Sequence, residues 1–236
     1  MKMEANVYSP KPFADTDDET IESGGLHSQN PLHPSQMAIP LHILALRRLA
    51  SKIIKKVYSA SKDNHQSLEE RVGIIQSLHK ELIDWRRNMP FPLQDVHPQV
   101  PHLSSSWFDF NYHTHLAMLY RPSPLLPTLD ESRVKTLAMA AAMSIREAVN
   151  MHRQHRFAYN WLNLLSVYTS TLSLIYAVTT RPDNLIDVLK ETKAIDDLKL
   201  AIVIFDTLSV KFAAAKKIRR MVDEIVKRYE GLSFPN

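Results

Sequence analysis

The chain has 236 residues, of which 44% are hydrophobic and 23% charged, with a net charge of +4. This is the composition of an ordinary globular protein, long enough for one sizeable hydrophobic core or two small ones. It has four glycines and no cysteine, which excludes disulfides, thiol nucleophiles, cysteine-ligated zinc and the glycine-rich loops that cradle nucleotide phosphates.

The N-terminal segment differs from the rest of the chain. Residues 1–34 contain an acidic run from Asp15 to Glu19, a Gly24–Gly25 pair and several prolines. The N-terminus is polar and acidic and carries no recognisable secretory signal. We therefore expect residues 1–34 to be a disordered or linker segment, and residues 35–236 to form a helical domain.

The first periodic segment predicts an amphipathic helix. Pro40 lies near its start, where proline is tolerated. Apolar residues recur at four-three spacing, which is the pattern of one helix face. This face consists of Ile39, Ile43, Leu46, Ala50, Ile53 and Val57.

A second helix is predicted by its start and stop signals. Ser67 and Glu70 have the spacing of a capping box, and Pro90 lies beyond the end of the apolar stripe. That stripe consists of Leu68, Val72, Ile75, Leu78, Leu82 and Trp85. Residues 90–103 contain four prolines and predict an extended loop.

The aromatic segment after this loop is the most informative part of the chain. Ser104–Ser106 can cap a helix, and Pro122 ends it because proline disfavours helical geometry in the residue before it. Residues at spacings of four, three and four line one face of this helix: Phe108, Tyr112, His115 and Leu119.

The C-terminal half continues the helical pattern. Asp130 is expected to cap a helix whose small alanines let a neighbouring helix approach closely. The segment Trp161–Val178 is the most apolar stretch, but its asparagine, serine and threonine residues argue against a membrane span and favour a buried central helix. Asp183 or Asn184 is expected to cap a short helix.

Two more helices are predicted over residues 194–208 and 218–229. We find no convincing strand and no internal repeat. The expected architecture is all-α, a multi-helix array of about seven or eight amphipathic helices packed through their apolar faces.

Three elements in this order resemble one family. They are the helix that contains Arg47–Arg48, the element that carries Trp85 and Pro90, and the aromatic segment. The last matches the pattern W-f-x-x-x-Y-H … L-y-R-P through Trp107, Tyr112, His113, Leu119, Tyr120, Arg121 and Pro122. Together they resemble the regulatory (middle homology) domain of fungal binuclear zinc-cluster transcription factors, in particular its C-terminal half.

The resemblance implies an α-helical array in which these signature residues are structural. It implies a nuclear regulator of RNA polymerase II genes that responds to a small-molecule effector or to protein partners. Those partners include the transcription machinery and a homo- or heterodimer partner. No residue is assigned to an effector pocket.

Members of this family bind DNA through six cysteines that hold two zinc ions near the N-terminus. This chain has no cysteine, so we expect no zinc, no other cofactor and no direct binding to nucleic acid, and we identify no DNA-binding residue. A shortened gene model, an alternative start and a natural module without the cluster all remain open. The alternative function is an interaction module that pairs with a full-length regulator and titrates it.

A helical metal-dependent enzyme is a remote alternative. His113 and His115 are two residues apart and point about 200° apart on a helix, so they cannot share one ion. His152 and His155 can converge, but no carboxylate has matching spacing and HExxH is absent. Asp196–Asp197 does not continue into the Asp-Asp-x-x-Asp pattern of magnesium sites. We expect no catalytic and no metal-binding residue.

The remaining charged and large side chains are expected to be structural. The basic pairs are interpreted as solvated helix surface, with Lys216–Arg220 as the best candidate for nuclear import. Trp85, Trp107 and Trp161 are expected to be core anchors or interface residues. Core filling is favoured over an effector pocket for four methionines: Met118, Met139, Met143 and Met151.

Overall fold

The computed structural model describes residues 37–59, 66–91, 93, 100–180 and 192–233, and every regular element in these ranges is a helix. The all-α prediction is therefore confirmed. The elements are α2 (Ala38–Ile53), the π-helical η1 (Ile54–Tyr58), α3 (Leu68–Arg87), the 3₁₀ turn η2 (Pro101–Leu103), α4 (Ser105–Tyr120), α5 (Glu131–Arg153), α6 (Trp161–Thr179), α8 (Ala194–Ser209) and α9 (Ala213–Ser233). The expected short helix at Asp183 and the expected linker over residues 1–34 lie outside the described residues.

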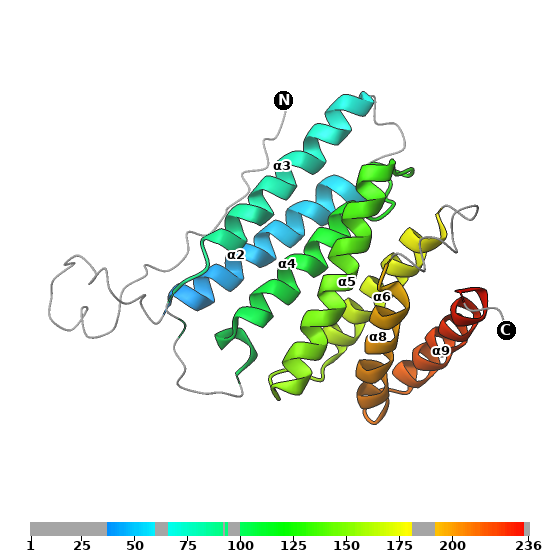
Figure 1. Cartoon of the computed structure of the whole chain (residues 1–236). Coiled ribbons are helices and arrows are strands. Elements are labelled where there is room, and N and C mark those ends of the chain that lie inside the picture. The colour runs from blue at the N-terminus through cyan, green and yellow to red at the C-terminus, as the bar shows by residue number, and fades with distance from the viewer. Residues whose placement is uncertain (1–36, 60–65, 92, 94–99, 181–191, 234–236) are drawn as a thin grey trace, which may run out of the picture.

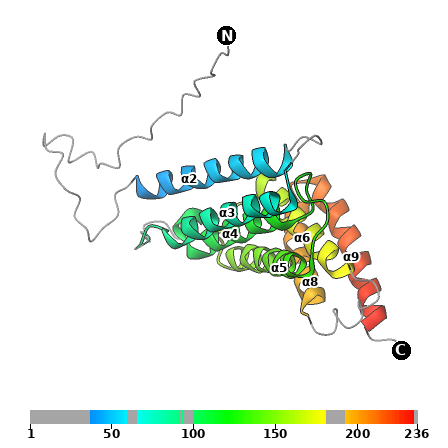
Figure 2. The same cartoon turned by 90° about the horizontal axis from the view of Figure 1, so that it is seen from above.

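The long helices lie side by side in one array (Figure 1). α4 packs on α3 and α5, α5 packs on α6 and α8, and α8 packs on α9. Figure 2 shows α2 as an outer layer that covers α3 and α4 with one face and leaves its other face outside. The signature helix α4 is therefore central, whereas α2 and α9 lie at the two edges.

Side chains cap the helices where the sequence predicts caps. Ser67 and Glu70 form both hydrogen bonds of the capping box at the start of α3. The hydroxyl of Ser104 accepts a hydrogen bond from the amide of Trp107 at 3.3 Å, and Asp130 accepts one from Arg133 at the start of α5. These bonds satisfy amide groups that a helix start leaves without partners.

Two clusters of buried side chains make up the core. One joins α2, α3 and α4 through residues such as Leu46, Leu82 and Phe108, and the other joins α5, α6, α8 and α9. Trp107 packs against both clusters. The two clusters therefore meet at the first turn of the signature helix.

The predicted apolar stripes match the buried residues in the middle of each helix and match them less well near the helix ends. In α2 and η1, Leu46, Ile53 and Val57 are buried, and Leu49 replaces the expected Ala50 as the fourth buried residue. Leu68, expected to begin the stripe of α3, is 67% exposed at the first position of its helix.

A chain of three hydroxyl groups crosses the middle of the array. Ser144 on α5 lies 2.9 Å from the hydroxyl of Thr114 on α4 and accepts a hydrogen bond from Ser170 on α6 at 3.0 Å. Ser144 and Ser170 are buried, so these bonds satisfy polar groups that would otherwise be costly to bury.

α6 differs from the buried central helix that we expected. It is the one helix among the described residues that is long and apolar enough to cross a membrane, yet 44% of that window is buried inside the protein. The buried side packs on α5 and α8. The opposite side exposes large apolar side chains: Trp161, Leu162, Leu165, Leu172 and Tyr176. Helical periodicity shows one apolar face, but a helix that is apolar all round gives no indication of which face is covered.

Candidate functional site

The signature residues lie on and around α4, and most of them build the core. Phe108 and Leu119 are buried against α2 and α3, while Phe110 faces the second cluster. Because α4 contacts α3, α5 and α6, it is buried on several sides rather than along the single predicted face. Tyr112, expected on that face, is half-buried.

Trp85 connects α3 to α2. Its indole Nε1 donates a hydrogen bond to the carbonyl of His42 at 3.0 Å, and its ring stacks on the imidazole of His42 at 5.0 Å between centroids. Phe108 of α4 lies 5.9 Å from the same indole. Trp85 is thus a core anchor that holds three helices together. Pro90 follows the end of α3.

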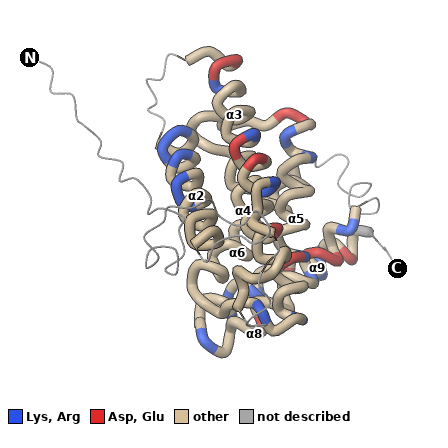
Figure 3. The backbone as a smooth tube through the Cα atoms, turned by 90° about the vertical axis from the view of Figure 1, so that its left-hand side faces the viewer, with Lys and Arg blue, Asp and Glu red and all other residues tan. Residues whose placement is uncertain are grey.

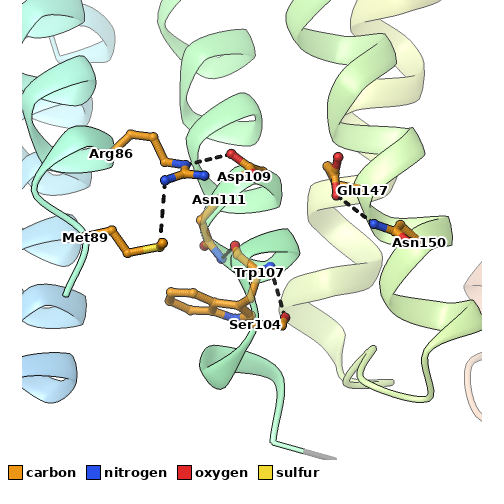
Figure 4. Close-up of polar contacts among 8 residues, drawn as sticks. All are labelled: Arg86, Met89, Ser104, Trp107, Asp109, Asn111, Glu147 and Asn150. Atoms are coloured by element: carbon orange, nitrogen blue, oxygen red, sulfur yellow. Dashed lines mark hydrogen bonds and ion pairs between the residues drawn. The ribbon is translucent and has the colours of Figure 1, made fainter. Parts of the chain in front are cut away.

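A second set of contacts, which are polar, holds the start of the signature helix α4 and connects it to α3 (Figure 4). Nε of Arg86 donates to the carboxylate of Asp109 at 2.6 Å. The amide of Asn111 donates to the carbonyl of Trp107 at 2.8 Å. Trp107 itself is partly buried, with its ring edge against Phe108. These contacts hold α3 and the first turns of α4 in place.

The two signature-helix histidines point in different directions, as their spacing predicts. His115 is 8% exposed and its Nδ1 lies 2.7 Å from the carbonyl of Asn111, while His113 packs edge-on against Tyr112. Burial lowers the pKa of both rings. The buried Nδ1 of His113 has no hydrogen-bond partner in the described part of the chain.

Tyr120 closes the contact between α4 and α3. Its hydroxyl lies 2.9 Å from Nδ1 of His79, and the two rings meet edge to face. Burial lowers the pKa of His79 and raises that of Tyr120, so both shifts favour the neutral forms of the two groups.

Arg121 at the end of α4 holds the end of η1. Its Nε donates to the hydroxyl of Tyr58 at 2.7 Å, and its guanidinium lies 5.0 Å from the centre of the Tyr58 ring. The Tyr58 hydroxyl in turn donates to the carbonyl of Met118, and the amide of Leu125 donates to the carbonyl of Val57 at 3.2 Å. Sequence reasoning missed Tyr58, because its partner is 63 residues away.

A pocket opens beside Arg121, where the end of α4 meets α5 and α6. Its volume is about 220 Å³. It is lined by Arg121, Pro122, Leu137, Thr169, Leu172, Ser173 and Tyr176. Apolar walls, three hydroxyl-bearing side chains and one guanidinium suit a small apolar molecule or side chain that carries an acidic group.

A larger hollow of about 630 Å³ lies at the start of α4 and is lined by Leu93, Leu103, Ser104, Ser105, Ser106, Gln154 and Arg156. Two of its hydroxyls serve the fold: Ser104 caps α4, and Ser106 accepts a hydrogen bond from Asn150 at 2.8 Å. Neither pocket is lined by the four methionines considered in the sequence. Of these, Met151 is buried in the core and Met139 is 47% exposed.

No group of three or more metal-ligating side chains comes together among the residues that the structure describes. Asp197, one of the acidic pair considered for magnesium, is 3% exposed and bound by Arg146. His152 is 2.6 Å from the hydroxyl of Tyr159. His155 follows α5 with a φ of 57°.

No family model and no solved structure matches the chain, but three curated fungal proteins do. Over 156 residues it is 22% identical to pyrimidine pathway regulatory protein 1 of Saccharomyces cerevisiae, covering 66% of this chain and 17% of that protein. Over 152 residues it is 23% identical to protein STB5 of the same yeast, covering 58% of this chain and 20% of STB5. Its homologues are fungal zinc-cluster transcription factors.

The third of these zinc-cluster homologues is transcriptional activator protein acu-15 of Neurospora crassa, which is 26% identical over 141 residues. That match covers 57% of this chain and 14% of acu-15. The resemblance inferred from the signature is therefore confirmed. The matched region spans a fifth or less of each zinc-cluster regulator, as expected for one regulatory region within a longer protein.

Proposed function

We propose that the chain is a regulatory domain that acts in the nucleus on RNA polymerase II genes, without a zinc-cluster DNA-binding module of its own. The observation that supports this most directly is the match to three fungal regulators, one of which is named a transcriptional activator. Residues 35–236 are the proposed domain and residues 1–34 a segment outside it. We propose no catalytic role and no cofactor for the chain.

The pocket beside Arg121 is the proposed site of effector action. A ligand changes the conformation of a protein only if it binds one conformation more tightly than another. An acidic group in this pocket would compete with Tyr58 for the guanidinium of Arg121. It would thereby loosen the contact that holds the end of η1 on α4. The outcome would be a change in how the α2 layer packs on the array.

A reporter assay tests this function. The whole chain is fused to an unrelated DNA-binding domain in yeast, and expression of an RNA polymerase II reporter is compared with that of the DNA-binding domain alone. We expect a several-fold change in expression. Arg121→Gln should alter that change, whereas Arg153→Gln, an exposed arginine at the end of α5, should not. Expression identical to that of the DNA-binding domain alone would rule the proposal out.

A second candidate, an interaction module that titrates a full-length regulator, is favoured by the exposed side of α6. Five large apolar side chains on one charge-free helix are typical of a surface that another protein covers. Co-purification of the chain with a full-length zinc-cluster regulator should be lost in the double variant Leu162→Ser, Leu165→Ser. Zinc-dependent, sequence-specific DNA binding by the isolated chain would contradict this alternative.

A further inference from the structure

The outer face of the second half of α2 and of η1 carries basic residues and no acidic one. Residues 38–58 contain five lysines and arginines and no aspartate or glutamate. In Figure 3, the Lys and Arg residues of α2 lie toward one end of the helix, and α2 carries no acidic residue. All five are exposed: Arg47, Arg48, Lys52, Lys55 and Lys56. The sequence analysis interpreted these pairs as solvated helix surface, and the structure places all five side chains on one face.

Helix geometry explains why these charges gather. At 100° per residue the five cations fall within about 180° of the helix circumference, opposite the buried residues Leu46, Leu49 and Ile53. They extend over about 13 Å along the axis. Leu44 and Ile54 lie among them and are 41% and 49% exposed. The face therefore combines a dense positive charge with exposed apolar side chains.

The fold supplies little negative charge to this face. Lys52 forms an ion pair with Glu81 of α3 at 2.7 Å. Within the described ranges, no carboxylate lies within ion-pair distance of Arg47, Lys55 or Lys56. Like charges this close repel one another, so an anionic partner on this face would relieve that repulsion.

The chain itself contains a complementary segment. Residues 1–36 carry six acidic and two basic residues, and four of the acids lie between Asp15 and Glu19. Phe13 and Ile21 flank this run with apolar side chains. Both the charge and the apolar content match the face formed by α2 and η1.

The connection between the two segments is long enough. Glu19 precedes the first residue of α2, Ala38, by 19 residues, which can span at most about 65 Å. The 16 residues of α2 extend over about 24 Å. Because both parts belong to one chain, their effective concentration is far higher than that of a separate partner.

We propose that the acidic run Asp15–Glu19 binds the basic face of α2 and η1 in the same chain and so shields it from other anionic molecules. The contact is electrostatic, so it weakens as salt shortens the Debye length from about 8 Å at physiological ionic strength to about 3 Å at 1 M. The proposal does not depend on the function proposed above.

The absence of cysteine allows a direct test on the whole chain. Spin labels are attached at Ala14→Cys and Ser59→Cys, and the distance between them is measured by double electron–electron resonance. Ala14→Cys with Val210→Cys, on the exposed residue that follows α8, is the reference pair. We expect a short-distance population for the first pair in 50 mM NaCl that falls at least threefold in 1 M NaCl.

Matched charge variants identify the contact. Lys55→Glu with Lys56→Glu should remove the short distances. Lys216→Glu with Lys217→Glu makes the same charge change on two exposed lysines of α9 and should leave them unchanged. Neutralising the run with Asp15→Asn, Asp17→Asn, Asp18→Asn and Glu19→Gln should act like the first variant. Circular dichroism checks that each variant keeps its helices.

Two outcomes would overturn the proposal. One is a distance distribution that neither salt nor the α2 charge reversal alters. The other is that the basic face of α2 and η1 binds a separate nucleic acid molecule and not the acidic run of the same chain. In that case the labels show no short distances at any salt concentration, and a 20-base-pair duplex binds the wild-type chain but loses affinity for the Lys55→Glu, Lys56→Glu variant.

Discussion

The hydroxyl of Tyr58 lies between Arg121 and the carbonyl of Met118, accepting a hydrogen bond from the first and donating one to the second. One phenol therefore joins the end of η1 to the last turn of the signature helix. Burial raises the pKa of this phenol and the neighbouring arginine opposes that rise. The group stays protonated at neutral pH and can keep donating to Met118.

Removing this hydroxyl should destabilise the protein measurably. Tyr58→Phe keeps the ring under the guanidinium but leaves Arg121 Nε and the Met118 carbonyl without this partner. We expect a loss of about 1–2 kcal/mol in the free energy of unfolding, measured by urea denaturation. Tyr168→Phe, a half-buried tyrosine on α6, is the control and should have little effect. Equal stability of Tyr58→Phe and the wild type would show that the contact contributes nothing.

The ion pair between Arg146 and Asp197 should respond unequally to loss of either partner. Nε and one terminal nitrogen of Arg146 donate to the two carboxylate oxygens at 2.7 and 2.9 Å. The side chain of Asp197 is 4% exposed and that of Arg146 is 41% exposed. Arg146→Met leaves a buried carboxylate unpaired and should cost about 3 kcal/mol. Asp197→Asn leaves an arginine that water can reach and should cost about half as much.

Urea denaturation of both variants and of the double variant Arg146→Met, Asp197→Leu measures this asymmetry. The double variant should be more stable than Arg146→Met alone, because it removes the unpaired charge. The prediction is wrong if Asp197→Asn is the more damaging single change.

Stability should fall on acidification because of buried histidines. Burial lowers the pKa of His115, with the carbonyl of Asn111 opposing the shift, and burial also lowers the pKa values of His42, His79 and His113. The unfolded chain, with histidine pKa values near 6.5, therefore binds more protons than the folded one. The contribution of these histidines to the free energy of unfolding is fully present above about pH 6.5. It falls below that pH, by at most about 1.4 kcal/mol per pH unit for each histidine.

Unfolding free energies between pH 7.5 and pH 5 check this prediction. His115→Gln should be less stable than the wild type at pH 7.5 but should lose less on acidification, because one proton-binding difference is gone. Identical pH slopes for the variant and the wild type would contradict the role assigned to His115.

The two sides of α6 should respond differently to substitution. Leu164 is 2% exposed, whereas Leu162 and Leu165 are 63% and 45% exposed. Leu164→Ala should cost about 2–5 kcal/mol because it opens a cavity. The double variant Leu162→Ser, Leu165→Ser should change stability by only about 0.5 kcal/mol. Thermal unfolding followed by circular dichroism measures both. A large loss in the serine variant would mean that this side is covered in the folded protein.

Much of the fold follows from local sequence signals. The capping residues Ser67, Ser104 and Asp130 act within three residues of their partners, so their role can be predicted without knowing the tertiary structure. The centres of the apolar stripes are correct for the same reason. The segment Trp161–Val178 was expected to be the buried central helix, whereas the signature helix α4 is central and several of its sides are buried.

Other features depend on where distant segments meet. Tyr58 and Arg121 are 63 residues apart, and Arg146 and Asp197 are 51 residues apart, so neither pair has a local signal. Trp161 was expected to be a core anchor or an interface residue and is 55% exposed, which favours the interface. The periodicity of an apolar helix cannot distinguish a face covered by the same chain from one covered by a partner.

The hydroxyl chain that links Thr114, Ser144 and Ser170 has a consequence for any regulatory movement. Sliding or rotation of one of these three helices would break a hydrogen bond to Ser144, whose hydroxyl is buried. We therefore expect α4, α5 and α6 to keep their positions relative to one another. A regulatory movement would then involve the helices on either side of these three, namely α2 and α3 on one side and α8 and α9 on the other.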